Sequence, residues 1–151
     1  MCDGAGDGQD ADEIGRLALA TDRLRRRPRP TSPSALRGEL TRLRRIIDRV
    51  ELEFSTVAAA FADTAEEEWQ GCLSPLQWMR LECGMTAAAA ANAIAVGAQA
   101  DTLAESVTAV EDGRLGFAHL ALLAGTARSF QSSPTATAFE EQPLLDQATE
   151  S

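Results

Sequence analysis

Residues 34–61 read SALRGELTRLRRIIDRVELEFSTVAAAF, and this stretch decides the fold. Its large apolar residues recur at spacings that alternate between four and three, which is the heptad pattern of a long α-helix with one apolar stripe. Two i,i+4 pairs of opposite charge, Arg44 with Asp48 and Arg49 with Glu53, support the helix on the flanks of the stripe. The stripe consists of Leu36, Leu40, Leu43, Ile47, Val50, Phe54, Val57 and Phe61.

Two arrangements would bury this stripe: the helix packs along later helices of its own chain, or it pairs with another chain. In either case we expect the stripe to be the most continuously buried row of the protein, since burying each large apolar side chain contributes about 1.5–3 kcal/mol. Short later helices would leave its N-terminal half open in a monomer. That half would then be a surface for dimerisation or for docking of further helices.

Capping and turn signals predict four shorter helices after the long one. Ser74-Pro75 followed by Gln77 is a capping box, so a helix starts there, and Gly84 is suited to end it. Thr86 caps a second helix over residues 87–100, and the two helices form a helix-turn-helix-like hairpin. The hairpin is followed by a helix that ends at Gly113 and another that ends near residue 130. Small or buried positions are expected at Ala90, Ala93, Gly97, Leu103, Val107, Val110, Leu115, Leu122 and Leu123.

We therefore predict an all-α fold in which the long helix packs with the hairpin and with two further short helices. Residues 1–33 are rich in Arg and Pro and should form a disordered tail with a transient helix over 12–26. Residues 34–131 form the helical domain. Residues 132–151 form a partly disordered tail, in which Pro143-Leu144-Leu145 starts a helix near the end of the chain.

Charge is distributed very unevenly along the chain. All fourteen cationic residues are Arg, and between Arg16 and Arg49 eleven of them face three acidic residues, a net charge of +8. From Val50 onward three Arg face fifteen acidic residues, a net charge of −12. The basic segment is either a solvated linker, a contact for the acidic part of the chain, or a nonspecific DNA contact. The candidate contact residues are Arg23, Arg25, Arg26, Arg27, Arg29, Arg42, Arg44, Arg45 and Arg49.

The residues for catalysis are scarce. The chain has one His, one Asn and neither Tyr nor Lys, and no phosphate-binding glycine motif occurs in it. We expect His119 to be a partly buried residue of the last clear helix rather than a general base. Cys72, Cys83 and His119 lack the close pair spacing of a zinc site. The sequence therefore predicts a protein that is not an enzyme and that holds no metal or other cofactor.

Sequence-specific DNA reading by the hairpin is disfavoured. Its second helix offers only Thr86, Asn92 and Gln99 to base edges, and Arg80 stands where such a first helix usually carries a small residue. Residues 65–112 hold one Arg against eight acidic residues, a net charge of −7 that repels phosphate. We interpret the hairpin as structural.

Composition also indicates the compartment. No run of eighteen apolar residues could cross a bilayer, and the first thirteen residues are acidic and Gly-rich, unlike a signal peptide. Three cysteines are an odd number without a disulfide framework, which favours reduced thiols. We expect a cytoplasmic protein with no membrane partner.

Several short segments, taken in order and spacing, resemble one known family. They are residues 40–48 with Phe54, then Trp69-Gln70-Gly71, Ser74-Pro75-Leu76-Gln77-Trp78, Gly84-Met85-Thr86, residues 113–121 and residues 139–145. Over roughly residues 36–150 the chain is similar to the domain of unknown function family 222, also called the 13E12 repeat family. The resemblance implies a helical domain that usually precedes an HNH endonuclease module in bacterial proteins.

The resemblance implies a nucleic-acid context, but the His and Asn residues of such a nuclease module are absent, so no catalytic or metal-binding residue carries over. One interpretation is a non-catalytic accessory domain of an HNH-type protein with nonspecific DNA contact through the Arg-rich segment. The alternative is a truncated gene product without independent activity, or an oligomerisation module that pairs through the long helix with itself or with a full-length paralogue.

Overall fold

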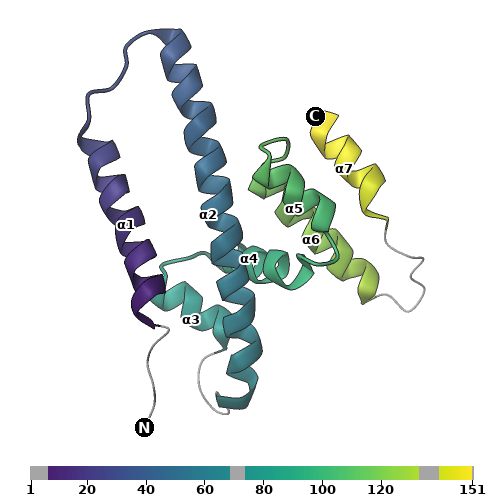
Figure 1. Cartoon of the computed structure of the whole chain (residues 1–151). Helices are drawn as coiled ribbons and strands as arrows, with labels where there is room; N and C mark the ends of the chain where they lie inside the picture. Colours follow the sequence, from purple (N-terminus) through teal and green to yellow (C-terminus); the bar gives the residue numbers. More distant parts are fainter. Residues whose placement is uncertain (1–6, 69–73, 133–139, 151) are drawn as a thin grey trace. The chain divides into compact units, whose positions relative to one another are not determined.

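The computed structural model describes residues 7–68, 74–132 and 140–150, and within these ranges helices joined by short connections are the only regular secondary structure, with no strand (Figure 1). The predicted all-α class is confirmed. The chain divides into two compact units, residues 1–39 and 40–151, with the boundary inside the long helix. The helices are α1 (Asp7–Arg26), α2 (Pro33–Glu68), α3 (Pro75–Glu82), α4 (Ala87–Gln99), α5 (Ala104–Glu111), α6 (Phe117–Gln131) and α7 (Glu141–Glu150).

The first unit contains α1, an extended connection and the first turns of α2. The helix α1 is longer than the transient helix expected over residues 12–26, and Arg16 stabilises its start through ion pairs with Asp12 and Glu13 at 2.7 and 2.6 Å. The Ser32 hydroxyl accepts a hydrogen bond from the Ala35 N–H, which caps the start of α2. Across the connection, Arg27 forms an ion pair with Glu39 at 2.6 Å.

The helix α2 uses a different face for its core contacts than the heptad pattern predicts. The prediction that the stripe from Leu36 to Phe61 is the most buried row is wrong, because only Leu43 and Phe61 are half-buried and Leu40 is 67% exposed. The residues that face the core lie one or two positions after a residue of the stripe. They are Asp48, Leu52, Ser55, Ala58 and Ala59.

The physical reason is the close approach of α4 to α2. A Cβ atom added to Gly97 would collide with the carbonyl oxygen of Ser55 and would lie 2.6 Å from the Cβ of Ala59. Two helix backbones can come this near only where both carry small side chains, and large residues such as Val57 would hold them apart. The predicted small face of α4 is thus confirmed, and its partner is the small face of α2.

The hairpin of α3 and α4 follows its local signals. Ser74 and Gln77 form the predicted capping box, with hydrogen bonds of 3.3 Å from the Gln77 N–H to the Ser74 hydroxyl and 3.1 Å from the Ser74 N–H to the Gln77 side chain. Gly84 has φ +63, as its place after α3 requires. The Thr86 hydroxyl accepts from the Ala89 N–H at 3.1 Å and caps α4.

Helices α4 to α7 enclose the main hydrophobic core, in which α4 packs extensively on α6. Leu103 and Val110 are buried as predicted, and Leu145 of α7 joins the same core, so the Pro143-Leu144-Leu145 segment contributes to packing. The expected burial of Leu122 and His119 is wrong, since Leu122 is 71% exposed and His119 is exposed. The inner face of α6 instead consists of Leu120, Ala121, Leu123, Ala124 and Ala127.

Candidate functional site

The densest positive charge lies at the end of α1 and in the connection that follows it. Residues 23–29 contain five Arg and no acidic residue. Arg27 is occupied by its ion pair with Glu39, whereas the other four are exposed and form no ion pair with a described residue. We call these four the cationic cluster: Arg23, Arg25, Arg26 and Arg29.

A structural role accounts for part of this cluster. The carbonyl groups at the C-terminus of a helix favour nearby cations by about 0.3–1 kcal/mol each. Arg23, Arg25 and Arg26 stand in the last turn of α1. Arg29 lies beyond that turn, between Pro28 and Pro30, where it contributes nothing to the helix. All four side chains remain free to contact an anion.

Two of the predicted contact residues on α2 make contacts within the protein. Arg44 binds Asp48 at 2.7 Å and Glu51 at 2.8 Å, and its hydrogen bond to Asp48 raises the pKa of the guanidinium above its usual value. The Arg45 side chain lies against the backbone of Gly113, where an added Cβ would be 2.5 Å from its Nε. Arg44 and Arg45 therefore belong to the framework that holds α2 to the rest of its unit.

Asp48 is the centre of that framework. It is only 5% exposed, and besides Arg44 it accepts a hydrogen bond of 3.3 Å from the N–H of Phe117, in the first turn of α6. A carboxylate is stabilised at a helix N-terminus by the exposed N–H groups and the helix dipole. Because Gly116 at the start of α6 has no side chain to cap it, Asp48 acts as the cap from α2.

A second carboxylate does the same for α5. Glu141 of α7 accepts a hydrogen bond of 2.6 Å from the N–H of Ser106, in the first turn of α5, which has no side-chain cap of its own. Sequence reasoning missed Asp48 and Glu141. The only signal was indirect: Leu103 and Gly116 stand at helix starts without a capping side chain, so the cap has to come from elsewhere in the chain.

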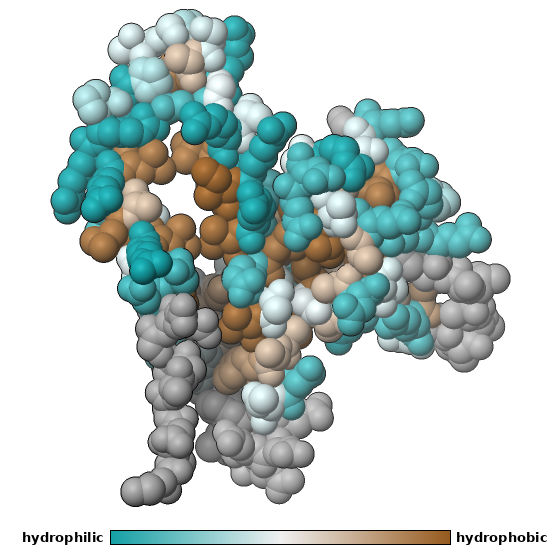
Figure 2. All heavy atoms as spheres, viewed as in Figure 1, coloured by the Kyte–Doolittle hydropathy of each residue, from teal (hydrophilic) through white to brown (hydrophobic). Residues whose placement is uncertain are grey.

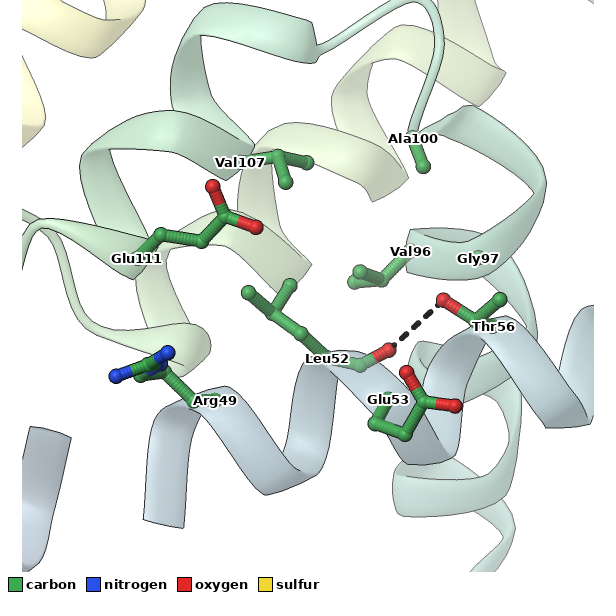
Figure 3. A pocket seen from close by; sticks show the side chains of 9 residues that line it. All are labelled: Arg49, Leu52, Glu53, Thr56, Val96, Gly97, Ala100, Val107 and Glu111. Atoms are coloured by element: carbon green, nitrogen blue, oxygen red, sulfur yellow. Dashed lines mark hydrogen bonds between the residues drawn. The ribbon is translucent and has the colours of Figure 1, made fainter. Parts of the chain in front are cut away.

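Arg49 lines a shallow hollow of about 260 Å³ between α2, α4 and α5 (Figure 3). Leu52, Val96 and Val107 form its apolar part, and Arg49 and Glu111 flank one side of it while Glu53 and Thr56 flank the other. The Thr56 hydroxyl donates to the carbonyl of Leu52 at 3.1 Å. The lining residues of the hollow thus include one cation and two carboxylates, and none of them is an activated nucleophile.

A larger, mainly apolar hollow of about 440 Å³ lies between α2, α4 and α6, with Phe54, Met85 and Leu122 in its wall. His119 and Asp48 line an adjoining hollow of about 390 Å³. Asp48 is committed to Arg44 and to the start of α6, so it does not orient His119 as a catalytic dyad would require. Among the described residues no three His, Cys, Asp or Glu side chains lie together so that they could hold a metal ion. Cys72, one of the three residues considered for a zinc site from the sequence, lies outside the described residues.

Two of the polar side chains of α4 and its cap that could contact bases are engaged in hydrogen bonds within the protein. The Gln99 side chain is buried and exchanges two hydrogen bonds with Gln131 of α6, at 3.0 and 3.2 Å. Thr86 is engaged as the cap of α4. Of the three polar side chains that could have read bases, only Asn92 is exposed and uncommitted.

No protein-family model, curated protein or solved structure matches this chain significantly. None of the helices that the structure describes is long and apolar enough to cross a membrane.

Proposed function

We propose that this protein is a non-catalytic helical module that contacts nucleic acid nonspecifically through the cationic cluster. The observation that carries the proposal is the state of Arg23, Arg25, Arg26 and Arg29, which are exposed and without ion pairs among the described residues. Lys and Arg bind DNA mainly by neutralising phosphates and releasing counterions, which needs uncommitted cations rather than a shaped pocket.

The rest of the chain supports a nonspecific contact. The helical part after Val50 carries a large excess of acidic residues, which limits phosphate contact to the basic segment. The proposal gives less weight to Arg27, Arg44 and Arg45, because each of these side chains makes contacts within the protein. Arg42 and Arg49 are exposed on α2 and add a weaker, secondary contact.

The resemblance to the 13E12 repeat family would place such a module beside an HNH endonuclease, which acts on DNA. In that setting the helical module would hold the nuclease near its substrate and leave the chemistry to its partner. A cytoplasmic location would give the module access to DNA, and the three cysteines fit reducing conditions.

Binding of a fluorescent random duplex, followed by anisotropy at low and at physiological salt, tests the proposal. The test variant carries Arg23→Gln, Arg26→Gln and Arg29→Gln. A matched control carries Arg80→Gln, Arg114→Gln and Arg128→Gln, which removes the same charge from exposed positions elsewhere. These six substitutions leave Arg25 and the α2 arginines in place.

We expect the test variant to bind at least about 10-fold more weakly at low salt, and the control to bind nearly as the native chain does. Equal weakening in both variants would mean that only net charge matters. Absence of binding by the native chain at low salt would refute the proposal.

A further inference from the structure

The outer face of α2 carries a row of large apolar side chains that the packing of the second unit leaves uncovered. Five of its six residues are exposed, with Leu40 at 67% and Val57 at 59%, and hydrophobic side chains along α2 are visible in brown in Figure 2. A contiguous apolar surface of this kind marks an interaction site. We call it the outer row: Leu40, Leu43, Ile47, Val50, Phe54 and Val57, of which Phe54 also lines the apolar hollow between α2, α4 and α6.

The outer row cannot turn inward, because the other side of α2 is committed to the core. Ser55 touches the backbone of Gly97, and Asp48 holds both Arg44 and the start of α6. Rotating the helix to bury Val50 would break both contacts. A partner has to come to the row from outside the unit.

The spacing of the row is symmetric about the point between Asp48 and Arg49. Leu40 and Val57 lie at equal distances from that point along the helix, and so do Leu43 and Phe54, and Ile47 and Val50. A helix with this symmetry presents the same pattern in both directions, which is what a two-fold, self-complementary interface requires. We propose that α2 pairs in antiparallel orientation with α2 of a second copy of this chain, through the outer row.

The distribution of charged residues along α2 favours the antiparallel orientation over the parallel one. Between residues 40 and 49 the helix has four Arg and one acidic residue, Asp48, whereas residues 50–61 have Glu51 and Glu53 and no cation. An antiparallel pair places the arginines of each copy beside the acidic half of the other copy. A parallel pair would place the two arginine-rich halves side by side, where like charges repel. The pairing needs neither the cationic cluster nor nucleic acid.

Sedimentation velocity of the full chain from about 1 to about 100 µM measures the pairing. We expect a reversible dimer, and we expect Leu40→Glu with Val57→Glu to weaken its association at least about 100-fold. Leu81→Glu on α3 is the matched control, since Leu81 is also 67% exposed but lies outside the row, and it should leave the dimer intact. Circular dichroism should show unchanged helix content, because all three positions are exposed.

A charge swap tests the orientation. In the antiparallel pair Arg42 lies near Glu53 of the second copy, so Arg42→Glu should weaken the dimer and Arg42→Glu with Glu53→Arg should restore it. In a parallel pair these two positions are about 16 Å apart along the axis, and the double change would restore nothing. A native chain that stays monomeric over the whole concentration range would overturn the proposal. A dimer that survives Leu40→Glu with Val57→Glu would overturn it too, and so would a failed charge swap.

Discussion

Replacing Gly97 by Ala tests the contact that sets the position of α2. The new Cβ would lie 2.6 Å from the Cβ of Ala59 and 2.8 Å from the carbonyl carbon of Ser55, where carbon atoms normally stay about 3.5–4.0 Å apart. One side of the clash is backbone, which cannot move aside as a flexible side chain would. The helices must therefore separate by about 1 Å, with an overpacking cost of about 3 kcal/mol.

Helix propensity works in the opposite direction and makes Ala about 1 kcal/mol more favourable than Gly within a helix. We expect Gly97→Ala to lower the free energy of unfolding by about 2 kcal/mol on balance. The matched control is Gly125→Ala in α6, where nothing lies within 4 Å of the added Cβ, so stability should rise by about 0.5–1 kcal/mol. Urea unfolding followed by circular dichroism measures both. Changes of the same sign in the two variants would refute the close packing of α4 on α2.

Three further changes test other contacts of the fold. Asp48→Asn should lower the free energy of unfolding by about 1–3 kcal/mol, because it removes the charge from a buried hydrogen-bonded group. Glu51→Gln, which removes the more exposed of the two carboxylates that pair with Arg44, should change it by less than about 0.5 kcal/mol, and similar losses for both variants in urea unfolding would contradict this. A double-mutant cycle with Gln99→Ala and Gln131→Ala should give a coupling of about 0.5–1.5 kcal/mol, and additive losses would show that the amide pair contributes nothing. His119→Ala should shift thermal stability by less than about 0.5 kcal/mol, since the side chain is exposed, and a larger loss would mean that it packs in the core.

Local sequence signals predicted the structure correctly where it depends on interactions between residues a few positions apart. The capping box at Ser74, the cap at Thr86 and the glycine that ends α3 each depend on hydrogen bonds or backbone angles of neighbouring residues. Gly113, with φ +76, lies two residues after the end of α5, where the sequence predicted that a helix ends. Such features need no knowledge of the tertiary fold.

The buried face of α2 could not be found in the same way. A heptad pattern is defined by large apolar residues, so it indicates the row that includes Val50 and Val57. The face used for packing contains Ser55, Ala58 and Ala59. Small residues give little hydrophobic signal, and their value lies in the close approach they allow to Gly97. The buried face of α2 therefore depends on the residues of both α2 and α4, and the pattern of α2 alone does not predict it.

For the candidate site, the sequence alone could predict only that one segment is rich in arginine. The Arg-rich segment is plain in the sequence, but which arginines are committed depends on partners far along the chain, such as Gly113 beside Arg45. Arg44 and Asp48 were expected to pair at i,i+4 and do so, yet nothing in their spacing indicated that Asp48 also caps α6. Remote caps of this kind are set by the tertiary packing.

The salt dependence of duplex binding tests the central claim, that the cationic cluster contacts phosphates. The slope of log K against log salt concentration counts the phosphates that a protein neutralises, at about 0.9 per contact. Removing Arg23, Arg26 and Arg29 should make the slope shallower by about three units, whereas the control that removes Arg80, Arg114 and Arg128 should keep the native slope. An unchanged slope in the first variant, or an equal change in both, would contradict the account.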